Sequence, residues 1–276
     1  MMKKIKNTLS IMFNLKNIKD EMFQFNKRTY DLLDTAKYYS SESHLKLLDK
    51  PEETVIKLFE NKLKDMKMLD IGVGGGRTTY HFAGLVKEYI GIDYSENMIK
   101  VCKERFKDIH FEVCDVRSMH IFEDNYFDFI LFSAGGIDHV PLGDRLKALQ
   151  EIKRVCKHGG LVGICVHNLQ NIDKLFELEI SINPVAMIRN IRRCLLFRLG
   201  NKSKEELREQ KCVLINNYEN RHKTIYMKPE EQIKQLTDIG FKNIRVYSHS
   251  EGKKLNNKLE LDSVTDNRIL YLCDIL

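Results

Sequence analysis

The sequence lacks the features of several specialised protein classes. It has no Cys-x-x-Cys pair, and its 7 cysteines are scattered, several of them inside apolar runs such as residues 161–166. This pattern predicts reduced thiols in a core rather than a disulfide framework or a zinc site. No apolar run approaches the ~18 residues that a membrane span requires. The sequence therefore favours a globular protein held together by an ordinary apolar core.

The N-terminus also lacks a complete targeting segment. Met-Met-Lys-Lys resembles the start of a signal peptide, but Asn14 and Lys16 interrupt the apolar stretch behind it. No small-residue cleavage site follows. We therefore expect a cytoplasmic protein.

The remaining composition suits one α/β domain with an insertion, since 276 residues with 43% hydrophobic content can bury a sizeable core. From residue 67, short apolar runs alternate with helix-period segments, which is typical of βαβ units and a parallel sheet. Strands are expected at 67–71, 89–93, 109–113, 127–132, 161–166, 241–247 and 269–273. The sequence thus predicts a doubly wound, seven-stranded, mostly parallel sheet.

Two segments lie outside this alternation. Residues 1–66 are expected to form a helical N-terminal cap beside a main domain of residues 67–276, and Tyr30, Tyr38 and Tyr39 of this cap are expected to close over a bound cofactor. Residues 169–226 are expected to form a helical insertion after the fifth strand. Insertions of this kind usually shape a substrate pocket.

The insertion carries a concentrated positive charge. Its basic residues outnumber Glu205, Glu206 and Glu209 and are Arg189, Arg192, Arg193, Arg198, Lys202, Lys204, Arg208 and Lys211. Apolar residues alternate with these arginines, which predicts a basic amphipathic helix. Two interpretations stay open: contact with an anionic partner such as a phosphorylated sugar, a membrane surface or RNA, or a lid helix whose charges face water.

The clearest chemical motif follows the first expected strand. It reads Asp70-Ile-Gly72-Val73-Gly74-Gly75-Gly76, and glycines there let the backbone turn sharply and approach a ligand closely. The dinucleotide fingerprint would require a glycine where this chain has Arg77. A carboxylate at Asp70 would repel a pyrophosphate but would suit ammonium and sulfonium charges. The motif therefore favours S-adenosylmethionine over NAD.

Two further acids follow the next two strands. Asp93 ends the second strand, at the distance from the glycines where an acid accepts hydrogen bonds from ribose hydroxyls. Asp115 follows the third strand and is placed to accept from an adenine amino group. Because parallel strands end at one edge of the sheet, we expect all three acids to line a single groove.

These residues resemble the class I, Rossmann-like S-adenosylmethionine-dependent methyltransferases. The resemblance is close over about residues 65–168 and looser over 227–275. Its motifs are residues 70–76, 91–95, 114–116 and 127–132, with a turn at 154–160 in which Cys156 and His158 depart from the family pattern. The resemblance implies the strand order 3-2-1-4-5-7-6, with the seventh strand antiparallel.

The resemblance also implies roles for individual residues. Gly72 to Gly76 would surround the methionine part of the cofactor, Asp93 and Tyr94 the ribose, and Cys114, Asp115, Val116 and Met98 the adenine. Ser133 and Ala134 would lie near the sulfonium. Residues 133–140 and 161–168 are similar to a bacterial subgroup associated with glycan and capsule biosynthesis.

Methyl transfer depends mainly on positioning, which can supply ~7–11 kcal/mol, and a general base is needed only for an unactivated hydroxyl, where it adds ~10²–10⁴-fold. His139 follows the fourth strand and His167 ends the fifth, so each is a candidate base at the ligand edge. Asp138 could orient His139 or bind a substrate hydroxyl. For each of the three, a purely structural hydrogen bond is the alternative.

Several acceptor classes lack their motifs. No Asn/Asp-Pro-Pro-Tyr/Phe segment follows the fourth strand, no Pro-Cys pair occurs, and no clustered carboxylates for a catalytic metal can be assembled. The sequence therefore favours a small-molecule acceptor, with O-methylation of a glycan or glycan precursor, and no metal.

Nucleic acid is not the expected partner, although an RNA or protein methyltransferase docking through the basic insertion stays open. A catalytically idle S-adenosylmethionine-binding protein and an NAD oxidoreductase are the remaining alternatives. Peripheral membrane contact and the oligomeric state are left open.

Overall fold

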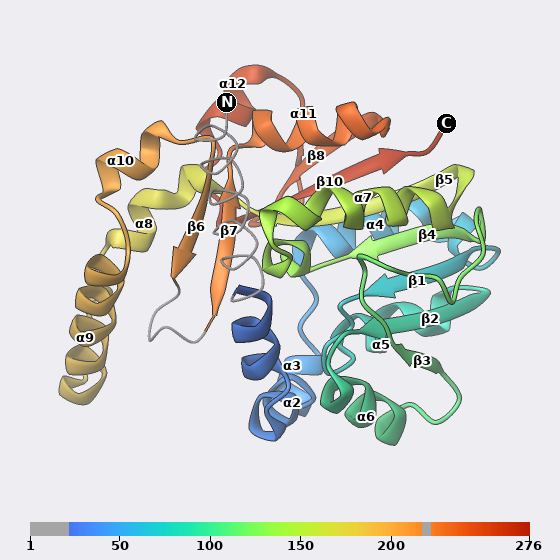
Figure 1. The fold of residues 1–276 in the computed structure, drawn as a ribbon, viewed down its shortest axis with the longest axis horizontal. Coiled ribbons are helices and arrows are strands. Elements are labelled where there is room, and N and C mark those ends of the chain that lie inside the picture. Colours follow the sequence, from blue (N-terminus) through green and yellow to red (C-terminus); the bar gives the residue numbers. More distant parts are fainter. Residues whose placement is uncertain (1–21, 217–221) are drawn as a thin grey trace, which may run out of the picture.

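A computed structural model describes residues 22–216 and 222–276. Within them, a central sheet of eight strands runs through the main domain, in the order β3-β2-β1-β4-β5-β10-β8-β9 (Figure 1). The strands are β1 (Lys67–Ile71), β2 (Glu88–Asp93), β3 (His110–Val113), β4 (Phe127–Phe132), β5 (Cys156–His167), β8 (Lys242–Ser248), β9 (Lys254–Leu255) and β10 (Arg268–Asp274). The expected mostly parallel α/β sheet is therefore present.

The prediction of a seven-stranded sheet is wrong. The described sheet continues past β8 to β9, a two-residue strand that pairs antiparallel with β8 at the edge. A strand this short has no detectable sequence period. β10 lies between β5 and β8 and is antiparallel to both, whereas β1 to β5 pair in parallel.

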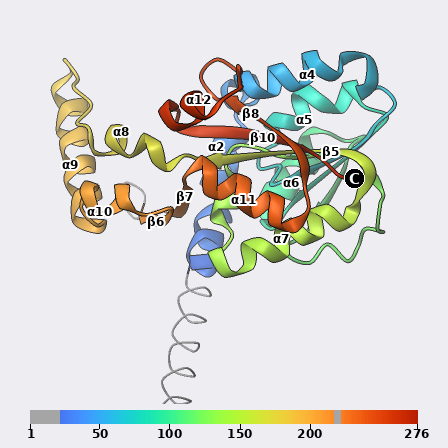
Figure 2. The same ribbon diagram turned by 90° about the horizontal axis from the view of Figure 1, so that it is seen from above.

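Helices cover both faces of the sheet (Figure 2). On one face, α4 (Lys50–Leu63), α5 (Arg77–Phe82) and α6 (Glu96–Arg105) pack against a core that includes Met68 of β1. On the other, α7 (Leu142–Val155) and α11 (Pro229–Ile239) pack against a core that includes Leu69. Adjacent strand residues thus serve opposite cores, as the alternation of a buried strand requires.

The shorter elements connect these layers. They are α2 (Leu33–Tyr39), α3 (Glu42–Leu45) and α12 (Lys258–Ser263), with the 3₁₀ helices η1 (Ala83–Leu85), η2 (Gly136–His139) and η3 (Leu169–Asn171). The described part of the expected N-terminal cap consists of a helical stretch over residues 22–30 and helices α2, α3 and α4; residues 1–21 of that cap lie outside the described residues.

The insertion after β5 is not purely helical, contrary to prediction. Helices α8 (Ile172–Phe176), α9 (Pro184–Gly200) and α10 (Lys204–Glu209) are followed by a two-stranded antiparallel sheet of β6 (Cys212–Asn216) and β7 (Lys223–Met227). The insertion has its own small apolar core around Phe197 and Ile215. In both ribbon views it lies at one end of the molecule, beyond the central sheet (Figures 1 and 2).

Candidate active site

A pocket opens at the carboxyl edge of β1 to β4 and has about 1060 Å³ of empty space, part of it open to solvent. Its lining includes twelve of the residues predicted to contact the cofactor: Gly72, Val73, Gly74, Gly75, Asp93, Tyr94, Met98, Cys114, Asp115, Val116, Ser133 and Ala134. Four segments, at the ends of β1, β2, β3 and β4, therefore share one cleft.

The glycine loop shapes the wall beside β1. Gly72 and Gly74 have φ values of 67° and 56°, a left-handed conformation that only glycine adopts without strain. Gly76, also left-handed, caps α5 and is not part of the pocket lining. At Gly75 a β-carbon would lie 2.3 Å from the carbonyl carbon of Tyr39, so the loop and the N-terminal segment touch backbone to backbone.

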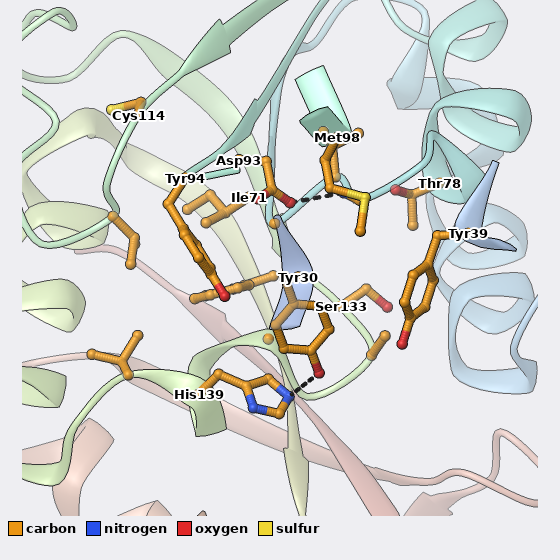
Figure 3. Close-up of a pocket in the computed structure, with 18 of the residues that line it drawn as sticks. Tyr30, Tyr39, Ile71, Thr78, Asp93, Tyr94, Met98, Cys114, Ser133 and His139 are labelled. Atoms are coloured by element: carbon orange, nitrogen blue, oxygen red, sulfur yellow. Dashed lines mark hydrogen bonds between the residues drawn. The ribbon is translucent and has the colours of Figure 1, made fainter. Parts of the chain in front are cut away.

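Asp93 lies at the centre of the pocket wall (Figure 3). Its Oδ2 accepts the backbone N–H of Gly74 at 3.0 Å, and its Oδ1 accepts that of Ser95 at 2.9 Å. Burial raises the pKa of Asp93 to about 6, against the lowering effect of these two hydrogen bonds. Since each carboxylate oxygen can accept two hydrogen bonds, the carboxylate still has acceptor capacity towards the pocket.

Asp70 does not lie where it was predicted. Its carboxylate is buried behind the glycine loop, outside the pocket lining, and accepts hydrogen bonds from Thr78 and Tyr89. Burial raises its pKa to about 7. Asp70 therefore ties the start of α5 to β1 and β2, and the expectation of a carboxylate facing a sulfonium from this position is wrong. The reason is strand alternation, which turns the side chain of Asp70 into the apolar layer beneath α5.

Asp115 lines the pocket, but its carboxylate is already paired. Arg117 binds it through Nε at 3.0 Å to each oxygen and through Nη2 at 2.6 Å. Arg117 also contacts Asp144 and lies over the ring of Phe23, 4.0 Å from its centroid. At the β3 end of the pocket, the ion pair of Asp115 and Arg117 is therefore covered by the ring of Phe23.

At the same end of the pocket, one buried polar atom lacks a hydrogen-bond partner among the described residues. This atom is the hydroxyl oxygen of Tyr94, which lines the pocket. A buried hydroxyl without a partner costs free energy unless a ligand or water satisfies it. Beside it, Met98 adds an apolar wall (Figure 3).

The N-terminal segment closes the opposite wall. Tyr30 and Tyr39 line the pocket, whereas Tyr38 is 64% exposed and lies away from it. The segment is fastened by Asp31, which accepts the Ser95 hydroxyl at 2.9 Å through its carboxylate and the Asn97 side chain at 2.6 Å through its carbonyl.

His139 is the one predicted catalytic residue that lines the pocket. Its Nε2 is 3.1 Å from the Tyr30 hydroxyl and its Nδ1 is 3.4 Å from the carbonyl oxygen of Lys223 (Figure 3). Because a carbonyl only accepts, Nδ1 carries the proton and Nε2 accepts from Tyr30. Burial, with help from His222 and His167, lowers the pKa of His139 to about 3, so the imidazole is neutral.

His167 and Asp138 form a separate pair behind the pocket. Asp138 is fully buried, accepts both the backbone N–H and the Nδ1 of His167 at 2.6 and 2.8 Å, and forms a salt bridge with Arg145 at 2.8 Å. The expectation that Asp138 orients His139 or binds a substrate hydroxyl is therefore wrong, because its oxygens face His167 and Arg145. His167 in turn supports Gly135, where a β-carbon would lie 2.4 Å from its ring.

The sequence is similar to those of known methyltransferases. The sequence model of a family described as a methyltransferase domain matches residues 68–160. A demethylmenaquinone methyltransferase of Staphylococcus aureus is 32% identical over 200 residues, 68% of this chain and 73% of that protein. Its counterpart in Staphylococcus saprophyticus is 30% identical over 67% of this chain and 74% of that protein. The chain belongs to the class I S-adenosylmethionine-dependent methyltransferases.

Solved methyltransferases share the fold of this methyltransferase. An S-adenosylmethionine-dependent methyltransferase from Clostridium acetobutylicum superposes with a TM-score of 0.61 at 16% identity, over 88% of this chain and 98% of that one. A didemethyltoxoflavin methyltransferase from Burkholderia thailandensis, with S-adenosylhomocysteine bound, gives 0.52 at 14% identity over 88% and 82%. None of the matched proteins described here supports the expected glycan and capsule subgroup, since the curated relatives are named for a quinone.

The methyltransferase contains one ion-pair network that its sequence did not reveal. Arg77 lines the pocket and binds Glu52 of α4 at 2.5 and 2.6 Å, and Glu52 also accepts from the Ser133 hydroxyl. A capping box of Asp49 and Glu52 marks the start of α4 and could have been found in the sequence. The partner of Glu52, 25 positions along the chain, could not.

Within residues 22–216 and 222–276, no three metal-binding side chains of the methyltransferase come together in a way that could hold a metal ion. Nor is any helix in those ranges long and apolar enough to cross a bilayer.

Proposed function

We propose that this methyltransferase methylates the hydroxylated aromatic ring of a reduced quinone. The observation that carries the proposal is the neutral Tyr30–His139 pair, which lies in the same pocket as Asp93 and the glycine loop. The names of the two staphylococcal relatives, which specify demethylmenaquinone, support the same class of acceptor. A glycan acceptor is not proposed.

In this proposal the pocket first binds the cofactor, which supplies a methyl group on a positively charged sulfur. Asp93 accepts from the ribose hydroxyls, and the unpartnered hydroxyl of Tyr94 gains a hydrogen bond from the bound nucleoside. Gly72 and Gly74 allow the backbone to approach the methionine part. The neighbouring apolar wall takes the adenine, through Met98, Cys114 and Val116, while Asp115 holds Arg117 in place.

Ser133 and Ala134 lie where β4 meets the pocket, close to where the methyl group would be transferred. Ala134 has a φ of 54°, a left-handed conformation that costs a residue with a β-carbon of order 1 kcal/mol or more. His167 and Asp138 hold the adjoining Gly135 from behind. We therefore assign His167 and Asp138 to positioning this turn, and not to proton transfer.

His139 acts as the base in this proposal. Its Nε2 already accepts the Tyr30 hydroxyl, so a ring hydroxyl that donates to Tyr30 can pass its proton through Tyr30 to His139. Loss of that proton makes the ring electron-rich and able to attack a methyl group. Burial keeps Tyr30 protonated, since it raises its pKa well above the ordinary value.

The acidity of the acceptor is the reason to expect an aromatic hydroxyl. Burial lowers the pKa of His139, and a weakened base takes a proton less readily from an unactivated sugar hydroxyl than from a more acidic hydroxyl. A phenolic hydroxyl, with a reference pKa of about 10, gives up its proton far more readily. Aromatic side chains that line the pocket near His139 and the glycine loop, Tyr30, Tyr39 and Phe132, also suit a flat ring.

The test is formation of S-adenosylhomocysteine from S-adenosylmethionine with a chemically reduced demethylnaphthoquinone as acceptor. We expect turnover by the wild type, and losses of ~10²–10⁴-fold in kcat for His139→Asn and Tyr30→Phe. His110→Asn, on the exposed end of β3, is the matched control and should keep wild-type turnover.

Cofactor affinity is measured in parallel by calorimetry with S-adenosylhomocysteine. This measurement distinguishes a variant that binds the cofactor poorly from one that binds it normally but transfers the methyl group slowly. Turnover of a nucleotide sugar or of RNA in place of the quinol would refute the proposed acceptor. Full quinol turnover by His139→Asn at equal cofactor occupancy would refute the role of His139.

A further inference from the structure

Helix α9 exposes to solvent an apolar stripe that Arg192 interrupts. Val185, Ile188, Leu195 and Leu199 are spaced at i, i+3, i+10 and i+14, which places them on one side of a helix. Their exposed fractions are 77%, 69%, 56% and 83%. Just before the helix, Ile180 and Ile182 are 84% and 103% exposed. We call these six residues the α9 stripe.

The α9 stripe lies on the opposite side of the helix from the residues that pack into the core of the insertion. The opposite side of α9 carries Phe197, which is buried and packs against Phe176 with ring centroids 5.0 Å apart. On the same side, the Asn190 side chain donates to the carbonyl of Glu179 at 2.9 Å. The helix therefore has two apolar sides, and the stripe has no packing role among the described residues.

Positive charge surrounds the stripe. Helix α9 contains four arginines and no aspartate or glutamate. Arg192 lies within the stripe, four residues after Ile188, and is exposed. Arg189 is exposed on one flank, and Arg198 on the other, where it also donates to the carbonyl of Phe176. The exposed acids of the insertion lie outside the helix, at Glu177, Glu179, Glu205, Glu206 and Glu209. Lys204 and Arg208 are instead paired with Asp173.

We propose that α9 docks the protein on the surface of a bilayer with anionic headgroups. A helix that lies in the interface buries its apolar side at the boundary of headgroups and acyl chains while its arginines contact the phosphates. Both ribbon views place α9 at one end of the molecule, away from the central sheet, where a flat surface can reach it (Figures 1 and 2).

Other occupants match only part of this surface. A nucleic acid would pair with the arginines but would leave the isoleucines and leucines in water. A second copy of the chain, packed stripe to stripe, would bring Arg192 of each copy close to the other without an acid on α9 to compensate. A bilayer surface takes up the apolar side and the arginines together.

The inference goes beyond the proposed function and does not depend on it, because docking is measured without acceptor or cofactor. If both hold, docking places the protein beside the membrane in which a quinone with an apolar tail is dissolved.

The experiment is sedimentation of the full-length protein with vesicles. We expect binding to phosphatidylcholine vesicles that contain phosphatidylglycerol, weaker binding to pure phosphatidylcholine, and weakening as salt is raised. The triple variant Ile188→Ser/Leu195→Ser/Leu199→Ser and the double variant Arg189→Gln/Arg192→Gln should each reduce partitioning by about tenfold or more.

The matched control is Lys258→Gln/Leu259→Ser on α12, which also removes an exposed cation and an exposed leucine and should bind vesicles like the wild type. Both α9 variants should bind S-adenosylhomocysteine normally, which shows that they are folded. Wild-type protein that stays in the supernatant with anionic vesicles would overturn the proposal. So would vesicle binding that both α9 variants retain, or a concentration-dependent dimer lost in the triple variant without any vesicle binding.

Discussion

At the scale of single residues, the pocket combines titratable groups whose pKa values are shifted in opposite directions by the same cause. Burial disfavours the charged form of any group, so it lowers the pKa of His139 to about 3 and raises that of Asp93 to about 6. Both groups are thereby biased towards their neutral forms. At neutral pH His139 is therefore uncharged, whereas Asp93 keeps most of its negative charge.

These shifts predict how stability depends on pH. Unfolded His139 binds a proton below pH ~6.5, whereas the folded protein resists protonation of His139 until pH approaches about 3. His139 therefore lowers the free energy of unfolding progressively as the pH falls through this window. Asp93 acts oppositely, because its pKa is raised on folding and the folded state binds its proton first between pH 6 and ~3.8.

His139→Gln isolates the first effect. We expect the free energy of unfolding of the variant, relative to wild type, to improve by about 1–2 kcal/mol between pH 6.5 and 5, since the glutamine cannot become charged. Urea unfolding of both proteins at each pH measures this difference, and other groups cancel in the comparison. A difference that stays constant with pH would contradict a buried, neutral His139.

At the scale of elements, the N-terminal segment and the glycine loop form one wall from two distant parts of the chain. Tyr39 and Gly75 meet backbone to backbone, while Asp31 fastens the segment to the start of α6. Arg77 at the start of α5 pairs with Glu52 of α4 in a largely buried ion pair. The pocket wall therefore depends on the segment before β1 as much as on the sheet.

Gly75→Ala tests this contact. The new β-carbon would overlap the backbone at Tyr39, so we expect a loss of about 1–3 kcal/mol in the free energy of unfolding and weaker binding of S-adenosylhomocysteine. Gly84→Ala is the matched control, because nothing lies within 4 Å of its β-carbon. The control should stay within about 0.5 kcal/mol of wild type. Equal behaviour of the two variants in urea unfolding and calorimetry would show that the contact is not formed.

At the scale of the whole molecule, the pocket joins parts of the chain that extend from Phe23 to Val140. A ligand that contacts all of them binds the folded state alone and therefore stabilises it.

S-adenosylhomocysteine should accordingly raise the free energy of unfolding by about 2.7 kcal/mol at a concentration of 100 times its Kd. NAD at the same concentration should have no effect, and Asp93→Asn should lose most of the stabilisation by S-adenosylhomocysteine because its amide is a weaker acceptor for ribose hydroxyls. Thermal or urea unfolding with each ligand measures this. Stabilisation by NAD would overturn the cofactor assignment.

Much of this protein can be predicted from local sequence. The parallel strands up to β5 were detectable because buried strands are short apolar runs between helix-period segments, and the glycine loop was detectable because only glycine allows its backbone. Asp93 could be placed because it ends a strand at the ligand edge of a parallel sheet, a position that the local pattern already specifies. Strands β6 and β7 were missed because five-residue strands inside a helical insertion give no sustained period.

What the tertiary structure decided is which way side chains point and what they meet. Asp70 and Asp93 both lie at strand ends beside the glycine loop, but one faces the apolar layer under α5 and the other faces the pocket. Likewise, His139 meets Tyr30 and Asp138 meets Arg145, through contacts that span from 7 to 109 positions of the chain. Sequence alone determined the fold class, which depends on local patterns of burial. It also determined the cofactor, through the motifs that follow the first three strands, although the role expected of Asp70 was wrong. The contact of His139 with Tyr30 and that of Asp138 with His167 depend on packing between segments that are far apart in the chain, and no local sequence pattern specifies such packing.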